Sequence, residues 1–294
     1  MPLITNFCRI ILPNINYLYL PKMTHHYIHV NGIKLHYTDK PGISESTIIF
    51  LHGRSLSAKS WTKQFESEKL SFFRLIALDF PGHGLSDHCD DYQEAYSFSA
   101  YKNLLIAFIF QLKVQNYVVA GLSLGGHIAL QALSGLKNCK GVFAMTMPVT
   151  KPIQMTLMYQ NPVILGKVFQ ENPSDEDLKY YISLLLRHDA NEIPSFIEES
   201  FYITDPKIHE GIMNGVLADG YDDEVEVIKN AKVPIAILAG SEEQIHDLSY
   251  LDNFDLPVWR KSYQMVPAAG HLLAWENPEY VNSLLKEFAL NCFD

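Results

Sequence analysis

Residues 118–130, VVAGLSLGGHIAL, place a lone serine among glycines between two apolar patterns. The run Tyr117 to Ala120 predicts a short buried strand, and His127 to Leu133 continues as a helix, so the glycines lie at a strand-to-helix turn. The spacing Gly121-Leu122-Ser123-Leu124-Gly125 is G-x-S-x-G. Glycines permit a sharp, strained turn that lifts the serine oxygen clear of the sheet, next to the positive end of the helix. The turn therefore predicts an exposed nucleophile at Ser123, with an ordinary glycine-rich βα turn as the alternative.

The composition is that of a globular enzyme. The 294 residues are 48% hydrophobic and 19% charged, which predicts one large domain or a domain with an insertion. A formal net charge of −10 without any Lys/Arg cluster disfavours nucleic acid and anionic membranes as partners, because both would be repelled. The acidity favours a neutral or apolar small molecule as substrate. No apolar run reaches the roughly 18 residues of a transmembrane helix.

The cysteines and histidines give no sign of a metal or a disulfide framework. The four cysteines are scattered without C-x-x-C spacing: Cys8, Cys89, Cys139 and Cys292. Reduced thiols in a cytoplasmic protein explain this pattern best. Histidine and acidic residues do not cluster at ligand spacing, so the sequence implies neither a metal nor another cofactor.

Residues 1–22 are expected to form an N-terminal extension. The apolar segment FCRIILPNINYLYLP resembles a signal peptide in composition, but it is interrupted by Arg9, Pro13, Asn14 and Asn16. A strand is predicted directly after Met23, so an upstream start codon assigned in error is an alternative explanation of the extension.

Strands and helices alternate along the rest of the chain. Eight segments have strand character: 25–30, 33–38, 47–53, 73–79, 117–122, 140–146, 234–240 and 262–267. The first two form a hairpin around Asn31-Gly32, and helices are expected at Ser99–Lys113 and Pro278–Leu290. This order predicts a mostly parallel sheet with helices on both faces and an antiparallel edge. Residues 149–222 contain helical patterns such as Glu176–Arg187 but no clear strand, which predicts a helical cap between core segments 23–148 and 223–294.

Four motifs in this order resemble the α/β-hydrolase family: FLHG at 50–53, LDFPGHGLSD at 78–87, GLSLGG at 121–126 and AAGH at 268–271. The resemblance covers about Tyr27 to Phe288. It implies an α/β fold with a mostly parallel eight-stranded sheet flanked by helices, and a helical cap inserted after the sixth strand.

The resemblance also implies a catalytic triad in the order nucleophile, acid, histidine. Ser123 occupies the nucleophile position, and His271 occupies that of the base, whereas His52 and His83 are expected to support the backbone and His127 to pack on the elbow helix. The family commonly places its acid at Gly-x-x-Asp after the seventh strand, where this chain reads Gly240-Ser241-Glu242-Glu243. Glu243 is therefore the expected acid, with Glu242 and Asp247 as alternatives.

Two backbone N–H groups are implied as oxyanion donors, those of Leu124 and Arg54. Because the main chain does this work, the side chain at position 54 is free to vary. The Arg54 guanidinium either enters the pocket or turns outward to pair with an acid. We expect the outward orientation, since an unpaired buried charge is costly.

A serine nucleophile predicts acyl transfer on esters, lactones or thioesters, or cleavage of a carbon–carbon bond beside a carbonyl. GLSLGGHIAL, Glu243, VPIAILAG and AAGHLLAWENP together resemble the serine-type, metal-independent N-acyl-homoserine lactonases. The segment SDEDLKYYISL is similar to their cap segment, which implies that Tyr181, or Tyr180 in a register shifted by one, lies over the oxyanion. The chain departs from them at Arg54, where they carry asparagine. A general carboxylesterase, a carbon–carbon bond hydrolase and a non-catalytic small-ligand receptor of the same fold are the alternatives.

Overall fold

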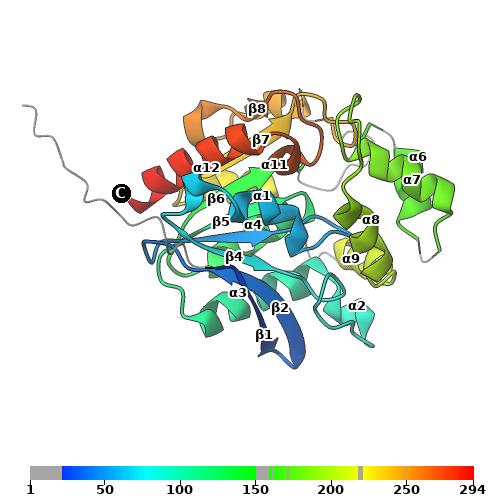
Figure 1. The fold of residues 1–294 in the computed structure, drawn as a ribbon, viewed down its shortest axis with the longest axis horizontal. Helices are drawn as coiled ribbons and strands as arrows, with labels where there is room; N and C mark the ends of the chain where they lie inside the picture. Colours follow the sequence, from blue (N-terminus) through cyan, green and yellow to red (C-terminus); the bar gives the residue numbers. More distant parts are fainter. Residues whose placement is uncertain (1–21, 150–158, 161, 171, 218–220, 248) are drawn as a thin grey trace, which may run out of the picture.

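The computed structural model describes residues 22–149, 159–160, 162–170, 172–217, 221–247 and 249–294. Eight strands form one sheet in the order β1-β2-β4-β3-β5-β6-β7-β8 (Figure 1). The β1/β2 and β2/β4 pairs are antiparallel, and all other pairs are parallel. The mostly parallel eight-stranded sheet with an antiparallel edge, expected from the sequence, is confirmed.

The strands follow the predicted segments closely. Their bounds are β1 Thr24–Val30, β2 Ile33–Lys40, β3 Thr47–Leu51, β4 Arg74–Leu78, β5 Tyr117–Leu122, β6 Cys139–Met145, β7 Ile235–Gly240 and β8 Gln264–Val266. Asn31 and Gly32 join β1 to β2 with φ values of 52° and 85°. Positive φ at both central residues fits the twist of a two-residue hairpin turn, which is why Asn-Gly predicts one.

Helices cover both faces of the sheet, with α1 (Thr62–Phe65), α11 (Leu273–Glu276) and α12 (Pro278–Phe293) on one face and α3 (Phe98–Leu112), α4 (Leu124–Ala132) and α10 (Glu224–Asn230) on the other. Short helices flank them: α2 (Tyr92–Ala95) and the 3-10 turns η1 (Ala58–Trp61), η2 (Glu68–Leu70), η3 (Leu133–Gly135), η4 (Ser249–Asn253) and η5 (Trp259–Lys261).

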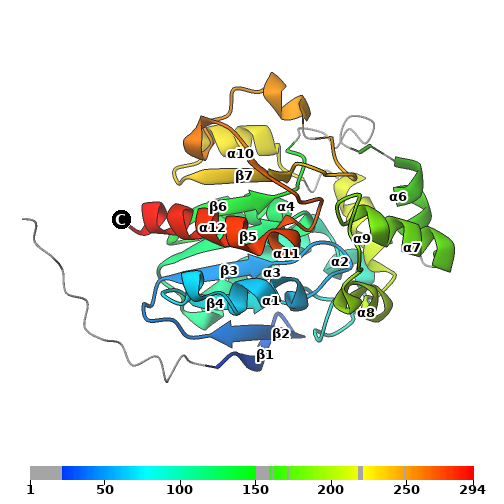
Figure 2. The ribbon, with the colours of Figure 1, turned by 45° about the horizontal axis from the view of Figure 1, so that its top comes forward.

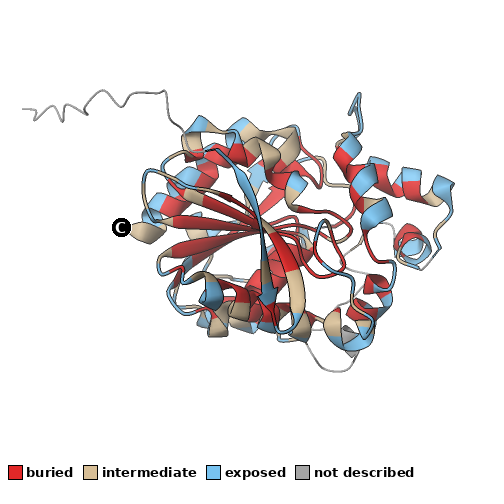
Figure 3. Cartoon of the chain, turned by 60° about the horizontal axis from the view of Figure 1, so that its bottom comes forward, coloured by how far each residue is buried: buried red, intermediate tan, exposed pale blue. Residues whose placement is uncertain are grey.

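Strands β3 to β7 are almost entirely buried on both sides, whereas β1 at the edge of the sheet is mostly exposed (Figure 3). Alternate residues of one strand enter different cores: Ile48 and Phe50 of β3 belong to the core that contains Phe288 of α12, whereas Ile49 and Leu51 belong to the core that contains Phe108 of α3. Strands buried on both faces need apolar residues at every position, which explains why the parallel strands read as continuous apolar runs.

Between β6 and α10, the described residues contain the helices α6 (Pro162–Val168), α7 (Asp175–Leu184), α8 (Ser195–Ile203) and α9 (Ile208–Leu217). Figures 1 and 2 show them together at one end of the molecule. In the described part of this segment the only extended pairing is an isolated bridge between Tyr159 and His246. The predicted extension lies outside the described residues up to position 21, as do 150–158, 161, 171 and 218–220 of the predicted cap.

No helix among the described residues is long and apolar enough to cross a membrane. Cys89, Cys139 and Cys292 carry free thiols, and Cys8 lies outside the described residues.

Candidate active site

Ser123 lies at the sharp turn between β5 and α4, with φ 50° and ψ −115°. The positions two residues before and two residues after Ser123 leave no room for a side chain. A Cβ atom on Gly121 would overlap the carbonyl oxygen of Gly125, and a Cβ atom on Gly125 would overlap that of Leu51. The glycines of G-x-S-x-G are therefore required by close backbone approaches, and they let the chain hold a serine at positive φ, a strained conformation for a residue with a side chain.

Two backbone N–H groups flank Ser123. The loop after β3 packs against the serine, since a Cβ atom on Gly53 would lie 3.5 Å from Ser123 Cβ. The N–H groups of Arg54 and Leu124 have no hydrogen-bond acceptor in the part of the chain that the structure describes. Leu124 is also the first residue of α4, where the helix dipole favours negative charge. Unpaired donors beside a serine are what an oxyanion requires.

His271 and Glu243 form a hydrogen-bonded pair. The imidazole Nδ1 lies 2.9 Å from Glu243 Oε2, and both side chains are nearly buried. The other oxygen, Oε1, accepts the backbone N–H groups of Ile245 at 2.7 Å and His246 at 3.2 Å. The Thr146 hydroxyl donates to the His271 carbonyl at 3.0 Å. Because the carboxylate accepts the Nδ1–H, the Nε2 atom of His271 is free to accept a proton.

The other acids considered from the sequence lie elsewhere. The backbone N–H of Glu242 donates to Ala269, and no contact joins its carboxylate to His271. Asp247 Oδ1 accepts the backbone N–H and the hydroxyl of Ser249 at 3.0 and 2.6 Å. Of the three candidates, Glu243 is the one that contacts the histidine.

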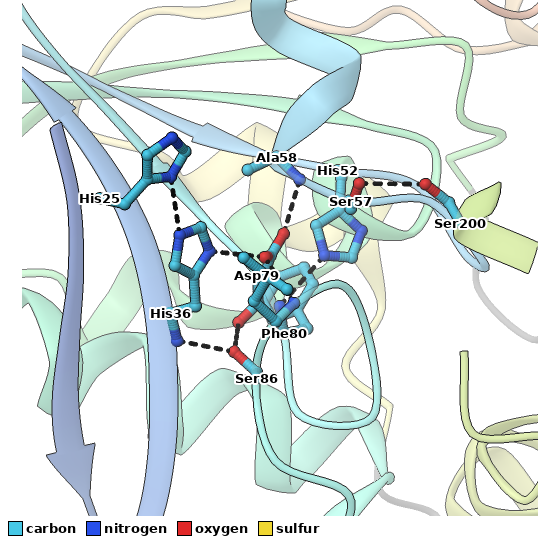
Figure 4. Close-up of polar contacts among 10 residues, drawn as sticks. His25, His36, His52, Ser57, Ala58, Asp79, Phe80, Ser86 and Ser200 are labelled. Carbon is cyan, nitrogen blue, oxygen red and sulfur yellow. Dashed lines mark hydrogen bonds and ion pairs between the residues drawn. The ribbon is translucent and has the colours of Figure 1, made fainter. Parts of the chain in front are cut away.

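A buried network below the site holds the loop that carries Arg54 (Figure 4). Asp79 accepts from His36 Nδ1 at 2.7 Å and from the backbone N–H groups of Ala58 at 2.6 Å and Leu85 at 3.0 Å. Burial acts to raise the pKa of Asp79, but the His36 hydrogen bond, the nearby His52 and the two backbone donors together lower it. The ionised carboxylate thus ties the start of η1 to the loop after β4.

His52 fixes the same loop from the other side. Its Nδ1–H donates to the Gly53 carbonyl at 2.8 Å, and its Nε2 accepts the backbone N–H of Phe80 at 3.1 Å (Figure 4). Burial lowers the pKa of His52, so the ring is neutral, as these two roles require. His83 is buried with Nδ1 3.0 Å from the Pro81 carbonyl. Both rings pair with the backbone, as the sequence led us to expect.

His127 lines the cavity and bonds to the buried Glu224. Its Nδ1 lies 3.0 Å from Glu224 Oε1 and 2.8 Å from the Tyr221 hydroxyl. His127 therefore packs on the elbow helix, as expected, and also forms a buried polar pair with Glu224.

A cavity of about 170 Å³ opens above Ser123. Its wall combines residues from the sheet loops with residues from α6, α7 and α9: Gly53, Arg54, Leu56, Phe98, Ser123, Leu124, His127, Tyr159, Leu165, Gly166, Phe169, Tyr181, Leu185, Ile212, Met213, Ile245, His246 and His271. The expected nucleophile, base and oxyanion residues thus share one cavity. Tyr181 lines it and is only 5% exposed, whereas Tyr180 is 50% exposed and outside the wall.

The expected outward orientation of Arg54 is wrong. The guanidinium carbon lies 4.2 Å from the centroid of the Phe169 ring, on the cavity wall. No carboxylate among the described residues pairs with it. The physical reason is the His52 and Asp79 network, which fixes the loop, together with the aromatic face that Phe169 offers to a cation. Burial lowers the pKa of Arg54, with nearby tyrosines opposing the shift.

His246 lies in the site but was not predicted from the sequence. It is 4% exposed, and its ring centroid lies 5.1 Å from that of His271 and 4.9 Å from that of Tyr159. Burial, reinforced by the charge of His271, sets the pKa of His246 well below its ordinary value, so the ring is neutral near pH 7. Only its position three residues after Glu243 could have indicated it.

Glu243, His246 and His271 each offer a potential metal-ligand atom, and these atoms lie within 4.8 Å of one another. The sequence showed no such cluster because folding brings the residues together. Both oxygens of Glu243 already accept hydrogen bonds, one from His271 itself. This bonding matches an acid that orients a histidine more closely than a metal ligand.

Comparisons with known proteins identify the class. A sequence profile of the alpha/beta hydrolase family matches residues 48–284. The AB hydrolase superfamily protein YisY of Bacillus subtilis is 28% identical over 267 residues, covering 82% of this chain and 91% of that protein. The bifunctional esterase/perhydrolase DCH of Acinetobacter calcoaceticus is 24% identical over 226 residues, covering 73% of this chain and 80% of that protein. The chain belongs to the α/β-hydrolase family.

Solved structures share its fold. The N-acyl homoserine lactonase AidH, in a complex with N-butanoyl homoserine, superposes with a TM-score of 0.84 at 22% identity, covering 92% of this chain and 97% of that one. A thermophilic esterase from Thermogutta terrifontis superposes with a TM-score of 0.74 at 20% identity, covering 92% and 100%. The resemblance to AidH in fold agrees with the resemblance in motifs.

Proposed function

We propose that the protein is a serine hydrolase that cleaves a small carboxylic ester or lactone through an acyl-enzyme. The observation that carries the proposal is the hydrogen bond between His271 and Glu243 at the wall of the cavity that Ser123 enters. A serine hydroxyl is a weak nucleophile at neutral pH and needs such an oriented base.

In the proposed mechanism His271 Nε2 takes the proton of the Ser123 hydroxyl as the oxygen attacks the substrate carbonyl. The backbone N–H groups of Arg54 and Leu124 bind the tetrahedral oxyanion, and Glu243 stabilises the imidazolium. His271 then protonates the leaving oxygen, which leaves the acyl group on Ser123. A water molecule, deprotonated by His271, hydrolyses this ester and restores the serine.

The helices α6 to α9 act in this proposal as the cap over the reaction. Tyr181 brings a phenol to the cavity from α7, and no hydrogen bond from a described residue acts on this hydroxyl. Burial raises the pKa of Tyr181, although Arg54 opposes the shift, so the phenol stays protonated near pH 7. It can therefore donate a hydrogen bond to the substrate carbonyl.

Substrates are expected to be short. The cavity of about 170 Å³ is smaller than the roughly 300–1,000 Å³ of sites that hold drug-sized ligands. N-acyl-homoserine lactones are one candidate class, supported by the motifs and by the fold shared with AidH. Simple carboxylic esters are the other, supported by the esterase named among the relatives.

The proposal is tested with a panel of N-acyl-homoserine lactones, simple lactones and p-nitrophenyl esters of increasing chain length. We expect turnover of at least one short ester or lactone, and a loss of about 10⁴-fold or more in Ser123→Ala, with an unchanged melting temperature. The exposed Ser283→Ala is the matched control. Retention of a tenth of the activity in Ser123→Ala would contradict the nucleophile assignment. Binding without any turnover would favour a receptor. Cleavage of a β-diketone added to the panel, without cleavage of any ester or lactone, would favour a carbon–carbon hydrolase.

A further inference from the structure

Arg54 differs from the other arginines of the chain. Among the arginines that the structure describes, Arg74, Arg187 and Arg260 each pair with a carboxylate, at 2.5, 2.9 and 2.6 Å from Asp39, Asp189 and Glu287. Arg54 has no carboxylate partner among the described residues, and it is the one whose guanidinium lines the cavity. The chain carries a formal net charge of −10, so acids are plentiful elsewhere on it.

The surroundings of Arg54 supply rings and phenols. Phe169 lies under the guanidinium, and His209 stacks on the same ring with centroids 5.0 Å apart. Burial, with a contribution from Arg54, lowers the pKa of His209 to about 3, so this ring is neutral near pH 7. Glu243, the acid that contacts His271, has both oxygens occupied by His271 and backbone N–H groups. Nothing described in the cavity neutralises the guanidinium.

Two phenols complete the polar part of this wall. Tyr159 and Tyr181 both line the cavity and both interact electrostatically with Arg54. Burial and nearby charges act on both phenols, and no hydrogen bond from a described residue acts on either hydroxyl. The planar guanidinium, with the neutral phenol of Tyr159 as a further donor, matches the two oxygens of a carboxylate, and Tyr181 is left for the reacting carbonyl. An unpaired buried cation is costly, so an anionic ligand would gain the most there.

We propose that the Arg54 guanidinium binds a carboxylate on the substrate, so that the preferred substrate is a short ester or lactone bearing a second, anionic carboxylate. This inference rests on the proposed hydrolase function and narrows its substrate class. The backbone N–H of Arg54 serves the oxyanion in that function, which leaves the side chain for recognition. Because the guanidinium and Ser123 line the same small cavity, only a few carbon atoms separate the carboxylate from the reacting carbonyl.

The test compares monomethyl glutarate with methyl pentanoate, which has the same chain length but ends in a methyl group. The measured quantity is the ratio of kcat/KM for the acidic ester to that for the neutral ester. We expect the wild-type enzyme to favour the acidic ester, and Arg54→Met to lower the ratio by about tenfold or more. Arg54→Lys should keep part of the preference, since it keeps the charge but not the planar fork.

Arg260→Met is the matched control. The Arg260 guanidinium also lies over an aromatic ring, 4.4 Å from the centroid of Trp259, but it pairs with Glu287 at the surface. Its replacement should leave the ratio unchanged. No preference for the acidic ester in the wild-type enzyme, or a preference that survives in Arg54→Met, would overturn the inference while the hydrolase function stands.

Binding separates the two proposals. Calorimetry with glutarate and the Ser123→Ala protein requires no turnover. We expect binding that weakens about tenfold or more when Arg54→Met is added. Binding that depends on Arg54, in a protein whose wild type hydrolyses neither ester, would support the carboxylate site and contradict the hydrolase function. Equal binding with and without Arg54 would overturn the site.

Discussion

Gly240, the last residue of β7, packs so closely on Gly270 that a Cβ atom at position 240 would overlap the Gly270 carbonyl oxygen. This contact brings the acid loop and the histidine loop together. Glu243 follows Gly240 by three residues, and His271 follows Gly270 directly. The hydrogen bond between the Glu243 and His271 side chains therefore depends on the close contact of two glycines.

Gly240→Ala should therefore lower both stability and activity. Forcing an atom into a packed backbone contact costs about 1–3 kcal/mol, and relief of the clash moves Glu243 away from His271. Thermal unfolding and ester turnover measure the two effects. For stability, the control is Gly166→Ala in α6, where an added Cβ meets nothing within 4 Å. A Gly240→Ala enzyme with wild-type melting temperature and rate would show that the contact is not needed.

Glu243→Gln should lower kcat by roughly 10⁴-fold, the loss seen when a triad acid becomes an amide. The reason lies in the backbone: Oε1 accepts two N–H groups, so an amide oxygen would take that position and turn its NH₂ toward His271. His271 would then keep its proton on Nε2, where it cannot act as a base. Glu242→Gln and Asp247→Asn should stay within a few fold. Equal losses across the three variants would move the orienting acid to another residue.

Much of this site could be predicted from the sequence because its landmarks are local. The strained turn at Ser123 follows from glycine spacing, and the place of His271 follows from the motif that precedes the last helices. The strands could also be predicted from the sequence, because parallel strands buried on both faces are apolar throughout. Their mostly parallel arrangement in one eight-stranded sheet agrees with what the family resemblance implied.

The remainder depends on contacts between distant segments. Arg54 enters the cavity because His36, Asp79 and His52 hold its loop, and because Phe169, more than a hundred residues later, covers its guanidinium. No local pattern contains that information. His246 likewise meets His271 only through tertiary packing. The choice between Tyr180 and Tyr181 depends on which face of α7 lies toward the cavity. A shift of one residue along the helix would exchange the positions of the two tyrosines.

Tyr181→Phe should lower kcat by about tenfold or more on the preferred substrate, with a smaller change in KM. A hydrogen bond to a carbonyl oxygen strengthens as negative charge develops, so its loss affects the transition state more than the bound substrate. Tyr180→Phe is the control, because that side chain is half exposed and outside the cavity wall. Steady-state kinetics of both variants decide the matter: a change in KM alone would give Tyr181 a role in binding only.

Treatment with a chelator should leave kcat/KM unchanged, and added Zn²⁺ should not raise it. A metal held by Glu243, His246 and His271 would compete with the hydrogen bond that orients His271. The measurement is ester turnover after exhaustive dialysis against EDTA, with metal content determined in parallel. Activity that falls with metal content and returns with one equivalent of metal would assign these residues to a metal site.

Acid should destabilise the protein through its buried histidines, and His209 is the clearest case. Burial and the nearby Arg54 lower its pKa to about 3, whereas an unfolded histidine has a pKa of about 6.5. Between these values the unfolded chain binds a proton at this position that the folded chain does not. The free energy of unfolding therefore rises with pH across this window, and the stability is lost as pH falls below about 6.5.

His209→Gln should accordingly flatten the fall in stability between pH 6.5 and pH 4. One histidine neutral in the fold contributes a slope of up to about 1.4 kcal/mol per pH unit, and removing the titrating ring removes that slope. Chemical unfolding at several pH values measures it, with the exposed His188→Gln as the control. The buried His52, His83 and His246, whose pKa values are also lowered, keep a residual slope in the same direction. A slope identical to that of the wild-type protein in His209→Gln would mean that the pKa of His209 is the same in the folded and the unfolded chain.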